Sequence, residues 1–97
     1  MKLNILLVED NPGDALLIEE LLSDDPGFHF NIVNSKTLES ALKQLEQKAF
    51  DIILLDLGLP DSHRLQGLKK ILPEVPEIPV IVITGLHDEK TGQRAVN

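Results

Sequence analysis

The sequence contains no cysteine, no tryptophan and no tyrosine, and only 3% of its 97 residues are aromatic. The absence of cysteine excludes disulfides, thiolate zinc sites, iron–sulfur clusters and cysteine nucleophiles. Basic residues are also few, because nine lysines and arginines face sixteen acidic residues and leave a formal charge of -7. That charge repels polyanions such as nucleic acids and anionic membrane surfaces. We therefore expect that this chain binds neither nucleic acid nor membrane directly.

Long hydrophobic runs and nucleotide-binding glycine motifs are missing as well. The apolar runs are only as long as strands, and the N-terminus lacks the apolar stretch of a signal peptide, so we expect a cytoplasmic protein. Neither Gly-x-x-x-x-Gly-Lys-Ser/Thr nor Gly-x-Gly-x-x-Gly occurs, which leaves a P-loop or dinucleotide site without support. Hydrophobic residues still make up 42% of the chain, enough for the core of a single domain over residues 1–97.

Compact aliphatic runs alternate with amphipathic stretches, a pattern typical of strands joined by crossover helices. Phe28–Val33 alternates apolar and polar residues, which favours a position at the sheet edge. Ile52–Leu55 is apolar at every position and should be covered by helices on both faces. The prediction is an α/β fold with a doubly wound parallel sheet. Its strands are Leu3–Val8, Phe28–Val33, Ile52–Leu55 and Val80–Ile83.

Helices are predicted between these strands. Asn11 to Asp14 supplies helix-initiating chemistry, and Thr37 is the predicted N-cap of the second helix. The third helix should stop near Pro73, since proline lacks the amide hydrogen that a helix needs. The predicted apolar faces are Leu17, Ile18, Leu21 and Leu22, then Leu38, Ala41, Leu42, Leu45 and Ala49, then Leu65, Leu68, Ile71 and Leu72, and a fourth helical segment starts at His87.

Polar side chains follow three of the predicted strands at the point where each strand ends. Glu9 and Asp10 follow the first, Asp56 the third and Thr84 the fourth. Because right-handed crossovers bring the carboxyl ends of parallel strands to one edge of the sheet, these side chains should converge there. Crowded carboxylates repel each other unless they bind protons or a hard divalent cation, and Mg2+ suits such a set best.

Asp56 is the best candidate for a nucleophile, because it ends the most fully apolar strand. A carboxylate can attack phosphorus and form an aspartyl phosphate when a metal neutralises the developing charge. Thr84 could donate a hydrogen bond to a phosphoryl oxygen. Any one of these residues alone is better explained as a solvated loop residue or as a favourable charge at a helix start. The functional prediction depends on their combination.

Three segments of the sequence resemble the receiver domain of two-component response regulators. Leu3–Asn11 is similar to the family's first strand with its acidic pair, and Asp51–Pro60 is similar to the strand and loop that carry the phosphoacceptor. Pro79–Gly85 is similar to the strand that ends in the switch hydroxyl. The resemblance covers the whole chain and implies a flavodoxin-like fold with strand order 2-1-3-4, before a fifth strand. Asn11 to Asp14 also resembles, more loosely, stand-alone receivers associated with phytochrome-type kinases.

The resemblance implies a role for each site residue. Asp56 would accept a phosphoryl group from a sensor histidine kinase or a phosphotransfer protein. Mg2+ would be bound by Asp10, Asp56 and the backbone carbonyl of Gly58, with Glu9 holding it through water, and Thr84 would contact the phosphoryl group as a switch. Such a domain signals by a conformational change. It is no enzyme toward other substrates, because it catalyses only its own phosphotransfer and dephosphorylation.

The sequence departs from the family at two places. Arg64 stands where relatives commonly have glycine. The family also continues with a fifth strand that carries a lysine, an aromatic switch residue and a last helix, and none of these is present, so we expect a C-terminally incomplete receiver domain. Val80–Ile83 would then be an exposed edge, which predicts a homodimer through this strand.

Two other functions remain open at this point. A receiver-like interaction module that works without phosphorylation would explain the missing lysine equally well. A small Mg2+-dependent phosphatase or phosphotransferase is disfavoured, because no acid or base that could turn over the intermediate is visible.

Overall fold

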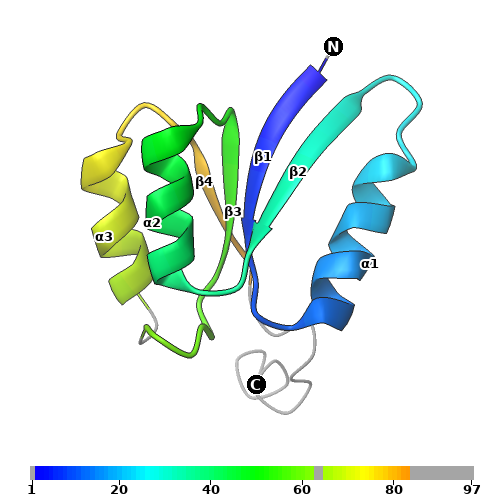
Figure 1. The fold of residues 1–97 in the computed structure, drawn as a ribbon. Coiled ribbons are helices and arrows are strands. Elements are labelled where there is room, and N and C mark those ends of the chain that lie inside the picture. Colours follow the sequence, from blue (N-terminus) through cyan, green and yellow to red (C-terminus); the bar gives the residue numbers. More distant parts are fainter. Residues whose placement is uncertain (1, 63–64, 84–97) are drawn as a thin grey trace, which may run out of the picture.

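The computed structural model describes residues 2–62 and 65–83, in which strands and helices alternate along the chain (Figure 1). Thr84, Arg64 and the predicted helical segment from His87 lie outside the described residues. The elements are β1 (Lys2–Val8), α1 (Pro12–Ser23), β2 (His29–Ser35), α2 (Leu38–Gln47), β3 (Ile52–Asp56), α3 (Gln66–Glu74) and β4 (Val80–Ile83).

The four strands form one parallel sheet in the order β2-β1-β3-β4. This order confirms the predicted doubly wound sheet, including the position of β2 at an edge. Ile5 of β1 pairs with Ile32 on one side and with Ile52 on the other, and Asp56 of β3 pairs with Ile83 of β4. All four strands therefore end at the same edge of the sheet, at the bottom of Figure 1.

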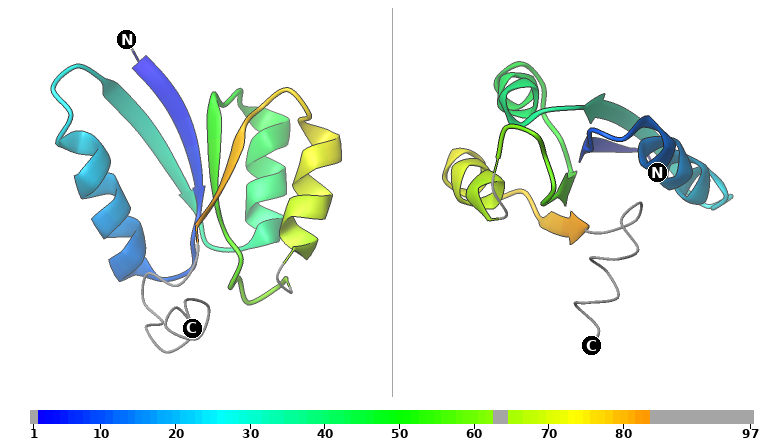
Figure 2. Two further views of the ribbon diagram at one scale, coloured as in Figure 1. Left: turned by 180° about the vertical axis from the view of Figure 1, so that it is seen from behind. Right: turned by 90° about the horizontal axis from the view of Figure 1, so that it is seen from below.

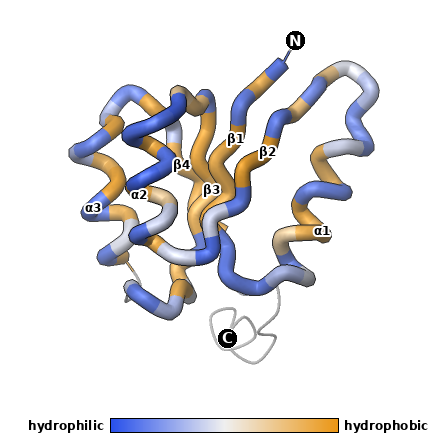
Figure 3. The backbone as a smooth tube through the Cα atoms, viewed as in Figure 1, coloured by the Kyte–Doolittle hydropathy of each residue, from blue (hydrophilic) through white to orange (hydrophobic). Residues whose placement is uncertain are grey.

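Helices cover both faces of the sheet. α2 and α3 pack on one face and α1 on the other (Figure 2), and the central strands are the most hydrophobic part of the chain (Figure 3). Because successive strand residues point to opposite faces, the core is divided in two. The buried cluster beneath α2 and α3 contains Leu6, Val8, Leu38, Ala41, Phe50, Ile53, Leu55, Leu59 and Ile71, and the cluster beneath α1 contains Leu7, Ala15 and Ile18.

The first two helices begin at the residues that the sequence predicts. The Asn11 side chain accepts a hydrogen bond from the Asp14 amide at 2.9 Å, and Thr37 Oγ1 accepts one from the Ser40 amide at 3.1 Å. Each cap satisfies a backbone donor that has no partner within the helix. Pro12 fits the first turn of α1, where a missing amide hydrogen costs nothing.

The buried face of α1 differs from the predicted one. Leu17 and Leu21 are exposed, the latter at 64%, whereas α1 buries Asp14, Ala15 and Ile18. Each helical residue advances about 100° around the axis. Leu17 is therefore about 100° away from Ile18, and Leu21, three residues after Ile18, lies on the same flank of the buried stripe. The helical spacing was correct, but it does not fix which stripe faces the sheet.

The later helices show similar differences. Ala49 is exposed, because α2 already ends at Gln47. α3 continues one residue beyond Pro73, since its last turn is closed by a hydrogen bond from the Val75 amide to the Ile71 carbonyl at 3.2 Å. In α3 the buried residues are Gly67 and Ile71, whereas the predicted face members Leu65 and Leu72 are exposed.

Two adjacent residues of α3 test this assignment. Replacing Ile71, which is fully buried, by alanine should lower the free energy of unfolding by about 2–5 kcal/mol, because a cavity remains in the core. The matched change Leu72→Ala should cost less than about 1 kcal/mol. Urea unfolding followed by circular dichroism measures both, and equal losses would contradict the assigned face.

Candidate functional site

Three acidic side chains meet where β1 and β3 end. Glu9 and Asp10 follow β1 directly, and Asp56 is the last residue of β3. β1 and β3 are paired neighbours, with Val8 opposite Leu55, so the residues that follow them emerge side by side. One carboxylate oxygen from each of the three residues lies within 4.8 Å of the other two. The structure thus brings together the three carboxylates that the sequence predicts to converge.

The acidic cluster, Glu9, Asp10 and Asp56, is largely closed to water. Glu9 is 2% exposed and Asp56 4% exposed, and Asp10 is half-buried. Asp10 Oδ1 and Asp56 Oδ2 are buried without a hydrogen-bond partner in the part of the chain that the structure describes. A buried anionic oxygen without a donor is costly. Because oxygen ligands of this kind are those that Mg2+ prefers, the cluster fits a divalent cation.

Gly58 lies against the carboxylate of Asp56. Its amide donates a hydrogen bond to Asp56 Oδ1 at 3.0 Å, which fixes the side chain and leaves Oδ2 available. A Cβ added at Gly58 would lie 3.6 Å from Oδ1 and 3.8 Å from Oδ2. Glycine here therefore leaves space beside both oxygens. The metal-binding role of the Gly58 carbonyl stays a prediction, and Thr84 lies outside the described residues.

Glu9 carries the strongest electrostatic perturbation of the cluster. Burial, followed by the neighbouring carboxylate of Asp56, raises the pKa of Glu9 from its ordinary value of 4.5 to about 8. The Asn11 amide donates to Glu9 Oε2 at 3.4 Å and offsets part of this effect. Without a cation, the cluster therefore keeps a proton near neutral pH.

Two residues that support the site were not predicted from the sequence. Asn34 is the last but one residue of the edge strand β2, and its side-chain amide donates to the carbonyl of Leu7 at 3.0 Å and to that of Glu9 at 3.2 Å. Asp61 follows β3 and accepts hydrogen bonds from the first amides of α2. Both sequence positions look like ordinary turn residues. Nothing in the sequence indicated that either residue belongs to the site, because the groups that they bond there lie far away along the chain.

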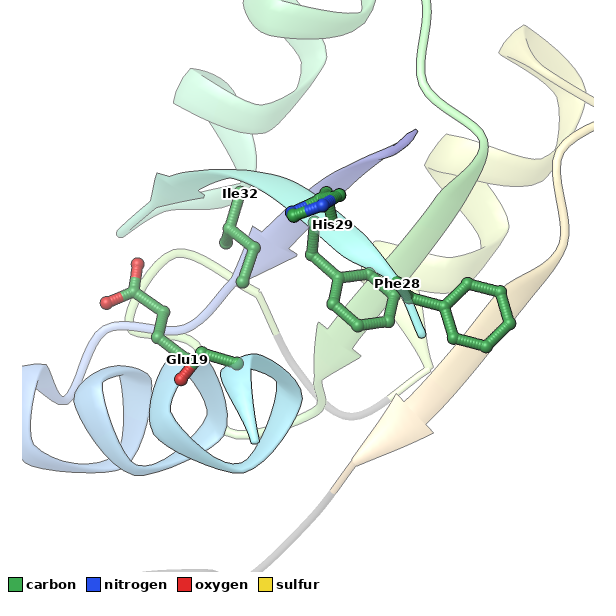
Figure 4. A pocket seen from close by; sticks show the side chains of 6 residues that line it. Glu19, Phe28, His29 and Ile32 are labelled. Atoms are coloured by element: carbon green, nitrogen blue, oxygen red, sulfur yellow. The ribbon is translucent and has the colours of Figure 1, made fainter. Parts of the chain in front are cut away.

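A separate hollow of about 400 Å³ lies between α1 and β2 (Figure 4). It lies against the beginning of β2, whereas the acidic cluster lies beyond the other ends of the strands. Ile32 of β2 and Glu19 of α1 both border it (Figure 4). The lining residues are Glu19, Ser23, Phe28, His29, Phe30 and Ile32. The hollow contains no residue of the acidic cluster, so the predicted chemistry does not involve it.

The family of the chain follows from comparison with known proteins. A family model described as the response regulator receiver domain matches residues 5–97. The chain belongs to this family. Receiver domains are signalling domains of two-component systems, and in general they interact with histidine kinases or phosphotransfer proteins. Among the described residues, no helix is long and apolar enough to cross a membrane.

Curated relatives of this receiver domain are longer proteins. The transcriptional regulatory protein ZraR of Salmonella typhimurium is 27% identical over 95 residues, which are 98% of this chain and 21% of ZraR. The glycerol metabolism activator of Pseudomonas putida is 33% identical over 94 residues, which are 95% of this chain and 42% of that protein. The chain thus spans less than half the length of these two relatives.

Solved receiver structures share the fold. MaeR bound to beryllium trifluoride superimposes with a TM-score of 0.76 at 28% identity, covering 97% of this chain and 76% of MaeR. The phosphorylated cyanobacterial phytochrome response regulator RcpA gives 0.75 at 30% identity, covering 99% and 74%. TrrA from Thermotoga maritima, in complex with Mg(2+)-BeF, gives 0.76 at 25% identity, covering 94% and 76%. These matches agree with the observed strand order.

The raised pKa of Glu9 predicts how pH affects the receiver domain. A carboxyl group with a higher pKa in the folded state binds more protons when folded, so the free energy of unfolding falls as pH rises between the two values. Without Mg2+, stability should therefore decrease from about pH 5 to about pH 8. Urea unfolding at several pH values measures this slope. Mg2+ should restore more stability at the upper end of the range than at the lower.

Glu9→Gln is the control for this titration, because it removes the ionisable group and keeps the size of the side chain. In this variant, the free energy of unfolding should depend less on pH between about pH 5 and about pH 8. An unchanged slope would show that another group carries the pH dependence.

Proposed function

We propose that this receiver domain accepts a phosphoryl group on Asp56 in a Mg2+-dependent reaction and signals by a conformational change. The proposal depends on two buried oxygens of the acidic cluster, Asp10 Oδ1 and Asp56 Oδ2, which have no hydrogen-bond partner among residues 2–62 and 65–83. A structural acidic patch on a surface would be solvated and would leave no such oxygens buried. The arrangement suits a site that receives a cation and an electrophile.

Each residue of the site has its own role in this proposal. Asp56 supplies the attacking oxygen, and the Gly58 amide holds its carboxylate in place at 3.0 Å. Asp10, Asp56 and the Gly58 carbonyl would hold Mg2+, with Glu9 binding it through water and Thr84 contacting the phosphoryl group. Bound Mg2+ neutralises negative charge on the transferring phosphoryl oxygens.

The phosphoryl transfer needs no reactant besides Asp56 and the phosphohistidine donor. A bond forms between a carboxylate oxygen of Asp56 and the phosphorus of a phosphohistidine. The phosphorus–nitrogen bond breaks, and its electron pair returns to the imidazole. The donor would be a histidine kinase or a phosphotransfer protein. The chain would then act as a phosphoacceptor, catalysing only its own phosphorylation and dephosphorylation.

The relatives support this proposal. RcpA was solved in a phosphorylated state, and TrrA was solved in complex with Mg(2+)-BeF. MaeR was solved with beryllium trifluoride bound. Because the chain spans 21% of ZraR, the output of a longer relative does not transfer to it. The proposal therefore concerns phosphotransfer by the receiver domain and includes no output activity.

Substitution of the proposed nucleophile is the direct test. With acetyl phosphate and Mg2+, the chain should gain one phosphoryl group, whereas Asp56→Asn should gain none, because no carboxylate remains at the attacking position. Intact-mass spectrometry measures the adduct. The matched control is Asp24→Asn, which changes an exposed carboxylate at the end of α1 and should leave labelling unchanged.

Two outcomes would contradict the assignment. Labelling of Asp56→Asn at another carboxylate would refute the role of Asp56. A folded wild-type chain that binds Mg2+ and never gains a phosphoryl group would favour the interaction module that works without phosphorylation.

The described sheet also supports a homodimer through β4. Ile81 is 50% exposed and Val82 40% exposed, although apolar residues of a strand are usually buried, and β4 pairs with β3 alone within the described residues. Sedimentation velocity should show association that increases with concentration. Ile81→Glu should abolish it, whereas Leu16→Glu, at an exposed leucine of α1, should not. A strict monomer at all concentrations would exclude this dimer.

A further inference from the structure

The carboxylate of Asp61 connects the segment after β3 to the start of α2. Asp61 Oδ1 accepts a hydrogen bond from the Leu38 amide at 2.9 Å, and Oδ2 accepts one from the Glu39 amide at 3.1 Å. The amides of a helix N-terminus lack partners within the helix and carry partial positive charge. We call these two hydrogen bonds the Asp61 bridge. The Leu38 amide in particular holds the pKa of Asp61 below its usual range.

The N-terminus of α2 has a cap even without the Asp61 bridge. Thr37 already caps this end, since its Oγ1 accepts from the Ser40 amide at 3.1 Å. Asp61 adds partners for two further amides, from a position 23 residues beyond Leu38. A long-range connection that is added to a local cap restrains the segment that supplies it as much as the helix that it reaches.

The segment between Asp56 and Asp61 is short and is held at several points. Asp56 is paired with β4 through Ile83. The Gly58 amide donates to Asp56 Oδ1 at 3.0 Å, and Leu59 is buried in the core beneath α2 and α3. With the Asp61 bridge closing its far end, this segment has little freedom to move Gly58 away from the carboxylate.

The same turn of α2 is also connected to the other acidic strand end. Ser40 Oγ donates to Ser35 Oγ at 3.3 Å, and the carbonyl of Ser35 accepts from the Glu9 amide at 2.9 Å. Ser35 is buried. The first turn of α2 thus contacts both segments that carry the acidic cluster, one through Asp61 and the other through Ser35.

We infer that Asp61 is a positioning residue for phosphoryl transfer: by bonding the start of α2 it holds Gly58, and through Gly58 the Asp56 carboxylate, in the reactive arrangement. This inference rests on the proposed phosphorylation of Asp56. Within the described residues, the carboxylate of Asp61 bonds the start of α2 and not the acidic cluster. Its effect is transmitted by the segment that joins it to Asp56.

A comparison of two caps at the same helix end tests the inference. Asp61→Ala removes the bridge, and Thr37→Ala removes the local cap without touching the segment after β3. At saturating Mg2+ and acetyl phosphate, Asp61→Ala should slow phosphorylation about tenfold, because a small displacement of the nucleophile is costly. Thr37→Ala should stay close to the wild-type rate. Asp61→Asn, which keeps one acceptor oxygen, should be intermediate.

The amide resonance of Gly58 gives a second measurement that does not require phosphorylation. In nitrogen–proton correlation spectra, Asp61→Ala should shift the Gly58 amide, and Thr37→Ala should not. Circular dichroism verifies that each variant is folded, and Asp61→Asn replaces Asp61→Ala if the latter unfolds. If the wild-type chain gains no phosphoryl group, the proposed function fails while the Gly58 shift still decides whether Asp61 positions this segment.

Two results would overturn the inference. Equal loss of rate in Asp61→Ala and Thr37→Ala would show that Asp61 acts only by stabilising α2. A folded Asp61→Ala chain with an unshifted Gly58 amide would show that the bridge does not restrain the segment.

Discussion

Negative charge held at the edge of an apolar sheet is the constraint on which the rest of the site depends. β1 and β3 are neighbours and both end in acidic residues, so the fold forces their carboxylates together away from water. Such a cluster is stable only when a proton or a cation compensates the charge. The raised pKa of Glu9 follows from this one arrangement, and so do the buried oxygens of Asp10 and Asp56 that lack a hydrogen-bond partner in the described part of the chain.

The strands were predictable because their signal is local. An apolar run identifies a buried strand, and the alternation in Phe28–Val33 correctly placed β2 at an edge. The buried faces of helices were less predictable, as Leu17 and Leu21 show, because both lie on the solvent side of α1. Periodicity gives the spacing of apolar residues around a helix. The crossing of the helix over the sheet decides which stripe is buried, and that depends on residues distant in sequence.

The residues of the candidate site also include some that the sequence predicts and some that it does not. Glu9, Asp10 and Asp56 were predictable, because the position of a residue at a strand end follows from the strands alone. Asn34 and Asp61 were not, since the groups through which they support the site lie 22 to 27 residues away along the chain. Each is a polar residue in a turn context until the fold gives it a partner. The carboxylates were thus visible in the sequence, and the groups that hold them in place were not.

The hydrogen bonds of Asn4 in β1 have a consequence for the alignment of the strands. Apart from Asn4 and the terminal residues Lys2 and Asp56, β1 and β3 consist of apolar residues. Sliding one strand by one residue would therefore replace one apolar contact by another, and apolar packing alone would resist it only weakly. Two hydrogen bonds at Asn4 resist such a slip. The backbone amide of Asn4 donates to the Asp51 carboxylate at 2.8 Å, just before β3, and the Asn4 side chain accepts from the Asn31 side chain of β2 at 3.1 Å. A slip of one residue would displace Asp56 from Glu9 by about 3.3 Å. The amino end of the sheet thereby sets the spacing of charges at its carboxyl end.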